Sequence, residues 1–329
     1  MNVLGELIIC KVAGEDANGS YSIIEEISPT GGGPSPHIHY ETEFAISDKR
    51  CFCRRANRTG SRIVKQICHD LAAEQQELDA VVANLDEAGW GTMTPSDGWD
   101  IKEQIRHLAY FENRAKLAAS NPEAFKQWHE KMRQDPDTMT RHQETTGKDL
   151  TAAETLKWWR EERSALLEIL AKMDHKLRLP WYGPGLSAMS FATARLMETW
   201  AHGQDILDAL GIRRKPTARL RHIAHLGVST FGWSYANRKM KAPDMPVRVE
   251  LTAPSGDMWS WGPEQAQDSV KGPAEDFCLV VVQRRHVADT DLIIHGKTAQ
   301  QWMSIAQAYA GPATDSPKPG KFLKRNNSC

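Results

Sequence analysis

The sequence predicts a mainly α-helical protein: a four-helix bundle over residues 63–213, followed by a small α/β domain over residues 214–311. Two observations carry this prediction. Apolar residues recur at helical spacing in four long segments that turn-forming residues separate. Beyond residue 240, apolar positions alternate with polar ones, as they do in half-buried strands. A short β-rich fragment, residues 1–47, precedes the bundle.

The β-rich fragment contains two strand-like runs, Leu7–Ile9 and Tyr21–Ile27, separated by turn-forming residues. It is too short to bury a core of its own. The residues that follow, 48–62, are basic, polar and without periodicity, and we interpret them as a linker. Helical periodicity begins at about Ser61.

Four long helices form the predicted bundle, with a short polar helix at residues 122–132 between the second and the third. The third helix opens with the capping box Thr151–Glu154, and Gly211 is suited to end the fourth. The four helices are expected at residues 61–85, 101–111, 151–173 and 187–210.

The remaining chain combines strands with helices, which is why we expect an α/β domain there. In chain order we expect a helix around 220–235, strands at 247–252 and 258–261, a buried helix at 273–283, a strand at 292–295 and a helix at 299–309. The polar residues 312–329 are expected to form a disordered tail.

Composition narrows the class of partner. Forty-one basic residues face 42 acidic ones, giving a net charge of −1, so no global electrostatic footprint indicates nucleic acid or an anionic membrane. No stretch approaches the roughly 20 apolar residues of a membrane helix, and the N-terminus lacks signal-peptide character. The six cysteines show no C-x-x-C spacing. We therefore expect a cytoplasmic protein with reduced thiols that acts on a small-molecule substrate.

One set of three residues indicates a metal site. Glu198 and His202 lie four residues apart in the last bundle helix, so both side chains share one face. His107, mid-helix among apolar neighbours, is the candidate third ligand. A His–Glu–His set leaves a coordination position open, as catalytic metal sites do. Judged by spacing alone, such a Glu–His pair is more often a surface ion pair, and a lone histidine like His107 is more often a structural helix residue.

The neighbourhood of these residues resembles a known family. WDIKEQIRHLA at residues 99–109 is similar to the opening motif of the mycothiol-dependent maleylpyruvate isomerase family, a branch of the DinB-like metal-binding four-helix bundles. ARLMETWAHGQD at 194–205 resembles its second motif, E-x-W-x-H-x-x-D. The resemblance covers about residues 63–311, and the C-terminal part also resembles a wyosine-type domain. The insert 122–150 departs from the isomerase branch.

The resemblance implies a cofactor and a set of site residues. His107, Glu198 and His202 would bind a divalent metal, usually zinc, and mycothiol or another low-molecular-weight thiol would ionise on it. Asp205 is expected to hold the His202 imidazole in its ligating tautomer. Arg284 and Arg285 are expected to bind the substrate anion. The alternative for Asp205 is a carboxylate that is merely solvated on the helix surface. The alternative for the two arginines is a favourable interaction with the dipole of the helix that they follow.

Trp99 and Trp200, beside the two motifs, are expected to wall a partly dry pocket. The open coordination position is expected to face a cleft between the bundle and the α/β domain.

The N-terminal fragment resembles a different family. Gly31, His37, His39 and Glu43 have the spacing of the first cupin motif, in which two histidines and a glutamate bind a metal. Arg50 stands where that motif expects glycine, and no second cupin motif follows. A barrel cannot close on half its strands. We therefore expect a truncated cupin-like fragment without a working metal site.

Together these features predict a metal-dependent, thiol-using isomerase or S-transferase acting on a small electrophilic, anionic substrate. Three alternatives stay open: a non-catalytic metal-binding protein, a metal-dependent hydrolase that uses water, and a cupin-type binding or oxygenase module.

Overall fold

The computed structural model describes residues 2–3, 6–12, 23–27, 53–183 and 185–322, with side chains from residue 64 onward except residue 136. The chain forms two compact units, residues 1–55 and 56–329. In the first unit, β1 (Asn2–Val3), β2 (Glu6–Val12) and β3 (Ile23–Ile27) form an antiparallel sheet. The cupin-like positions His37, His39 and Glu43 lie outside the described residues.

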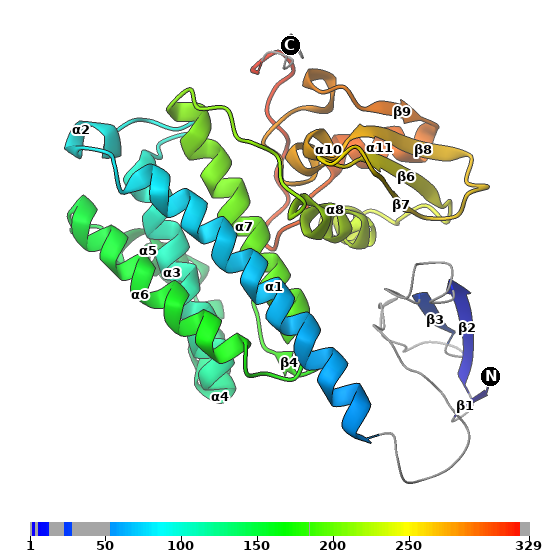
Figure 1. Cartoon of the computed structure of the whole chain (residues 1–329), viewed down its shortest axis with the longest axis horizontal. Coiled ribbons are helices and arrows are strands. Elements are labelled where there is room, and N and C mark those ends of the chain that lie inside the picture. The colour runs from blue at the N-terminus through cyan, green and yellow to red at the C-terminus, as the bar shows by residue number, and fades with distance from the viewer. Residues whose placement is uncertain (1, 4–5, 13–22, 28–52, 184, 323–329) are drawn as a thin grey trace. The chain divides into compact units, whose positions relative to one another are not determined.

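Four long helices of the second unit build the bundle (Figure 1). Asp100 and Thr151 cap α3 and α6 by accepting hydrogen bonds from the backbone N–H three residues on, and Ser187 caps α7 in the same way. The helices are α1 (Cys53–Val82), α3 (Ile101–Ser120), α6 (Ala152–Leu170) and α7 (Ala188–Ala209). The shorter α2 (Glu87–Trp90), α4 (Pro122–Arg133) and α5 (Pro136–Thr145) connect them.

Several boundaries differ from expectation: α3 runs to Ser120 rather than to residue 111, and α5 was not expected. The first bundle helix begins at Cys53, so the expected linker is partly helical. Residues 53–60 contain no proline, and a single glycine costs a helix only about 1 kcal/mol. Residues 312–322, expected to be disordered, lie against the protein as a C-terminal strap. The Gln283 amide donates to the Thr314 carbonyl (2.8 Å), and the Gly320 N–H donates to Asp289 (2.8 Å).

The C-terminal part contains a four-stranded sheet in the order β7-β6-β8-β9, with β6 and β8 parallel. The expected strands and helices are present, and β8 is the strand that the sequence did not predict, because DSVKGP has one large apolar residue. The elements are α8 (Leu220–Ser229), α9 (Phe231–Ala236), β6 (Val247–Thr252), β7 (Met258–Trp261), β8 (Asp268–Pro273), α10 (Ala274–Val281), η1 (Val287–Asp289), β9 (Ile293–His295) and α11 (Lys297–Ile305). A small ribbon, β4 (Arg178–Leu179) with β5 (Leu186–Ser187), precedes α7.

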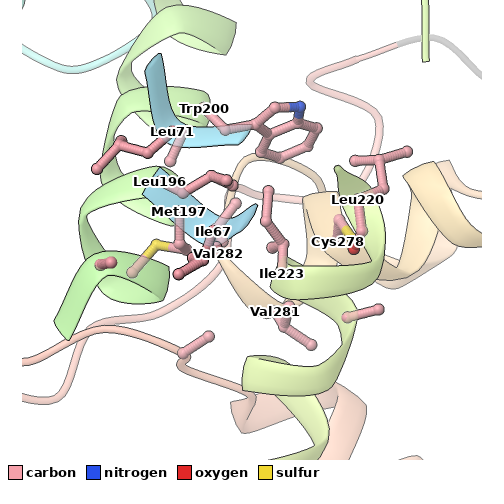
Figure 2. Close-up of a cluster of buried hydrophobic side chains, with 14 of the residues drawn as sticks. Ile67, Leu71, Leu196, Met197, Trp200, Leu220, Ile223, Cys278, Val281 and Val282 are labelled. Atoms are coloured by element: carbon pink, nitrogen blue, oxygen red, sulfur yellow. The ribbon is translucent and has the colours of Figure 1, made fainter. Parts of the chain in front are cut away.

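The bundle and the C-terminal part share one hydrophobic core (Figure 2). Leu71 of α1 and Leu196 of α7 belong to the same buried cluster as Ile223 of α8 and Val281 of α10. Helices α8 and α10 approach closely at Gly227, where an added Cβ would lie 2.8 Å from a Val281 methyl. This packing places the end of α10 beside α7. No helix among the described residues is long and apolar enough to cross a membrane.

Candidate metal centre

The structure brings His107, Glu198 and His202 together. One ligand atom from each lies within 4.8 Å of the others, and no other such group of three occurs in the described part of the chain. His202 Nε2 lies 3.4 Å from Glu198 Oε2, and the two imidazole centroids are 4.3 Å apart. Ligands of a tetrahedral zinc ion lie about 3.4 Å apart, so side-chain shifts of about 1 Å would close the set around an ion. The structure therefore places the three predicted ligands next to one another, and their binding of a metal stays a prediction.

Two helices supply the three side chains. Glu198 and His202 are one turn apart on α7, and His107 projects from the middle of α3, which packs against α7. Trp99 lies before the α3 cap, with its ring parallel to His202 (17°, centroids 6.0 Å) and 5.0 Å from His107. The ring centroids of Phe111 and His107 are 4.6 Å apart. Aromatic rings therefore border both imidazoles.

The second tryptophan expected at the site lies elsewhere. Trp200 is 3% exposed and belongs to the shared core, with the Arg214 guanidinium 4.9 Å from its ring. It is two residues from both Glu198 and His202 on α7, so its side chain points away from theirs. Of the two tryptophans expected at the site, only Trp99 borders it.

The protonation states suit a divalent cation. Burial lowers the pKa of His107 well below its ordinary value, and the charges of His202 and Arg195 lower it further. Burial opposes ionisation of Glu198, but the His202 hydrogen bond and the charge of Arg195 outweigh it, so the pKa of this carboxyl is lowered. A neutral imidazole and a carboxylate both offer lone pairs to a metal. The donor set therefore fits a divalent ion.

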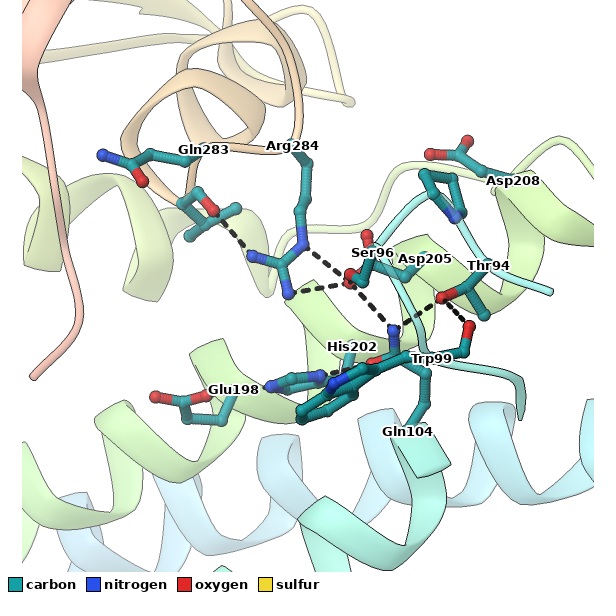
Figure 3. Close-up of polar contacts among 12 residues, drawn as sticks. Thr94, Ser96, Trp99, Gln104, Glu198, His202, Asp205, Asp208, Gln283 and Arg284 are labelled. Carbon is teal, nitrogen blue, oxygen red and sulfur yellow. Dashed lines mark hydrogen bonds and ion pairs between the residues drawn. The ribbon is translucent and has the colours of Figure 1, made fainter. Parts of the chain in front are cut away.

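The partner of His202 Nδ1 is Gln104, not Asp205 as expected. Gln104 Oε1 lies 2.5 Å from that nitrogen (Figure 3). Asp205 Oδ2 instead accepts from Ser96 Oγ (3.1 Å) and, at 3.5 Å, from the Gln104 amide. The imidazole reaches across to α3, so Asp205 acts on it through Gln104. At the other histidine, the Gln143 amide nitrogen from α5 lies 3.2 Å from His107 Nδ1.

The two arginines that follow α10 pair with different carboxylates. Arg284 donates to Asp205 Oδ2 from Nε (2.9 Å), and its Nη2 lies 2.8 Å from the same oxygen, which joins it to the site. Arg285 pairs with Asp208 (2.7 and 2.8 Å), and its guanidinium carbon is 3.9 Å from the Phe322 ring centroid. Of the two expected anion-binding groups, only Arg284 reaches the network around His202.

A cavity of about 220 Å³ adjoins this network, between the bundle and the C-terminal part. Asp205 and Arg284 line it, and the predicted ligands do not; His202 lies one turn along α7 from Asp205. The other lining residues come from the loop before α3 and from the region of the strap: Pro95, Ser96, Asp97, Gln283, Asp315, Pro317, Lys321 and Phe322.

Sequence reasoning missed both glutamines. Gln104 precedes His107 by three residues, and this spacing on one helix face was an available signal. Gln143 lies in the insert that departs from the resembled family, and nothing in its local sequence marks it.

Comparisons with known proteins agree with this arrangement. The family model "Mycothiol maleylpyruvate isomerase N-terminal domain" matches residues 71–207, and "Wyosine base formation" matches residues 243–295. Uncharacterized proteins from two strains of Mycobacterium tuberculosis are 44% identical over 243 residues, which is 74% of this chain and 95% of theirs.

Two solved structures are also similar: the crystal structure of the mycothiol-dependent maleylpyruvate isomerase and that of a mutant of it. Each has a TM-score of 0.45 and 15% identity, covering 67% of this chain and 89% of the other. The two sequence motifs, the match over the bundle and the relatives at 44% identity lead to one assignment. The chain belongs to the mycothiol-dependent maleylpyruvate isomerase family.

Proposed function

We propose that this protein is a metal-dependent enzyme that uses a low-molecular-weight thiol, an isomerase or S-transferase acting on a small electrophilic, anionic substrate. The observation that carries the proposal is the convergence of His107, Glu198 and His202, with ligand atoms within 4.8 Å of one another. The family supplies the second argument, because its named member is mycothiol-dependent.

A bound divalent ion, for which zinc suits two imidazoles and a carboxylate, would lower the pKa of a coordinated thiol or water. The chain's own residues prepare the site for it. The Glu198 carboxylate reduces a charge of +2 to +1 and leaves the centre cationic. Trp99 and Phe111 border the imidazoles and limit water, which strengthens electrostatic interactions there. Arg284 lines the cavity and, although it is paired with Asp205, is the candidate contact for a substrate carboxylate.

Neither of the two cysteines whose side chains the structure describes is suited to act as the nucleophile. Burial raises the pKa of Cys68 to about 11 and that of Cys278 well above its usual value, so both stay protonated thiols. The external thiolate would form a C–S bond at a carbon–carbon double bond conjugated to a carbonyl, and the π pair would move to the carbonyl oxygen. Rotation about the resulting single bond, followed by expulsion of the thiolate, gives the isomer. Protonation of the same enolate gives the S-transfer product.

Metal content tests the site. The full-length protein, loaded with Zn²⁺ and dialysed, should hold about one ion per chain, and His202→Ala should lose it. The exposed His295 on β9 provides the matched control, because His295→Ala removes an imidazole away from the three predicted ligands and should retain the ion. Equal zinc content in wild type and His202→Ala would contradict the proposed centre.

Turnover distinguishes the chemistries. Maleylpyruvate and mycothiol are the first probes, since they are named for the family. Turnover that requires the thiol supports the proposal. Full activity without thiol identifies a hydrolase that uses water, and bound metal without turnover of any electrophile tried favours a metal-binding protein.

A further inference from the structure

Gln104 occupies the centre of a polar network with one consistent assignment of protons. Its side chain is fully buried on α3. The amide nitrogen lies 2.9 Å from Thr94 Oγ1 and 3.5 Å from Asp205 Oδ2, and the amide oxygen lies 2.5 Å from His202 Nδ1 (Figure 3). Three different segments therefore meet at one amide group.

The partners on the nitrogen side determine how this amide is oriented. The Thr94 hydroxyl donates its single proton to the Trp99 carbonyl (2.8 Å), so toward Gln104 its oxygen only accepts. The Asp205 carboxylate is also an acceptor, and it forms an ion pair with Arg284. Both atoms require the NH₂ group of Gln104. The amide oxygen must then face His202.

An amide oxygen cannot donate a proton, so the hydrogen bond at His202 requires the proton to reside on Nδ1. Nε2 is the nitrogen that lies 3.4 Å from Glu198: it can donate to that carboxylate while the ring is doubly protonated, and it presents its lone pair there once the ring is neutral. We infer that Gln104 is a positioning residue that fixes His202 as the Nδ1–H tautomer, and that Thr94, Asp205 and Arg284 fix the amide of Gln104.

This inference rests on the proposed function only for its consequence, the presentation of Nε2 to a metal. Metal-ligating histidines commonly donate their other N–H to a carboxylate or a carbonyl. An amide oxygen performs that role here without adding a negative charge beside the centre. The carboxylate of Asp205 is one residue further out, where Arg284 neutralises it.

The direct test is histidine tautomer analysis of the metal-free, full-length protein. Two-bond proton–nitrogen correlation spectra of ¹⁵N-histidine-labelled protein, recorded at a pH where the spectra themselves show a neutral ring for His202, show which ring nitrogen carries the proton. His202→Ala assigns the signal. The expected result for wild type is Nδ1–H, and Nε2–H would overturn the inference whatever the variants do.

Variants separate positioning from packing. Gln104→Leu should give mixed tautomers at His202 and weaken Zn²⁺ binding about 10–100-fold in competition with a chromogenic chelator. Gln104→Glu keeps an acceptor oxygen and should keep the Nδ1–H tautomer. Gln75→Leu is the matched control: it removes another buried bundle glutamine, one that donates to Glu112 (3.3 Å), and should leave the His202 signal unchanged.

The outcomes distinguish the two proposals. If wild type shows Nδ1–H but binds no metal, the proposed function fails and the positioning role of Gln104 stands. If Gln104→Leu retains the wild-type tautomer and zinc affinity, the positioning role fails and the metal centre stands. Should that variant not fold, the wild-type tautomer and the Gln104→Glu spectrum still decide.

Discussion

Gln283 joins the end of α10 to the C-terminal strap, and replacing it should release the strap. Its backbone has φ = 58°, in the left-handed region that favours glycine. Its amide donates to the carbonyls of Ala306 (3.0 Å) and Thr314 (2.8 Å), and its oxygen accepts from Thr314 Oγ1 (2.7 Å) and the Tyr309 hydroxyl. A side chain is thus retained where glycine would relax the backbone.

The magnitude follows from these contacts. Four neutral hydrogen bonds contribute about 1 kcal/mol each, and water can replace some of them, so Gln283→Ala should lower the free energy of unfolding by about 2–4 kcal/mol. Gln283→Gly loses the same bonds but relieves the left-handed strain, worth about 1 kcal/mol relative to alanine. Glycine should therefore be the milder substitution.

Denaturant unfolding followed by tryptophan fluorescence measures these differences, and trypsin cleavage after Lys321 reports strap release. We expect faster cleavage in both variants, with Gln283→Ala the less stable. An alanine variant as stable as wild type, or a glycine variant less stable than the alanine one, would refute the reasoning.

Three further predictions concern the core, the site and pH. Gly227→Ala should destabilise by about 1–2 kcal/mol in thermal unfolding, since crowding against Val281 exceeds the helix-propensity gain; an unchanged melting temperature would contradict the close approach. Trp99→Phe should abolish most of the fluorescence quenching caused by Co²⁺ binding, whereas Trp261→Phe on β7 should retain it; the reverse pattern would place the ion elsewhere. Burial lowers the pKa of His225 from 6.5 to about 4, so protons bind the unfolded chain preferentially and stability should fall as pH drops from about 6.5 to 4. In chemical denaturation, His225→Asn should lose less stability over that range, and an equal loss would exclude His225 as a cause.

The grouping of Glu198 with His202 was predictable because the two residues share a face of one helix. His107 lies on another helix, and its place beside them was predicted from the resemblance of its motif to the family. The hydrogen-bond partners of the predicted ligands were harder to predict, because these residues come together only in the folded chain. Asp205 is near His202 in sequence, yet the imidazole turns toward α3 and bonds Gln104.

Two residues that are adjacent in sequence and alike in chemistry can also form different contacts in the fold. Arg284 and Arg285 follow the same helix, but one pairs with Asp205 and the other with Asp208. The helical core was predictable from periodicity, whereas the strap was not. Its contacts include hydrogen bonds between its backbone and the side chains of Gln283 and Asp289, and polar composition gives no sign of them.

The shared core in Figure 2 determines how molecules can reach the cavity. Leu196, Ile223 and Val281 each contribute about 1.5–3 kcal/mol through burial, so parting even five such side chains would cost about 7–15 kcal/mol. That equals the whole stability of a typical domain. A hinge motion that parts the two halves would therefore cost about as much free energy as unfolding a domain. A molecule that enters the cavity would pass the loop at residues 95–97 and the strap, which meet where the Lys321 ammonium donates to the Pro95 carbonyl (3.0 Å).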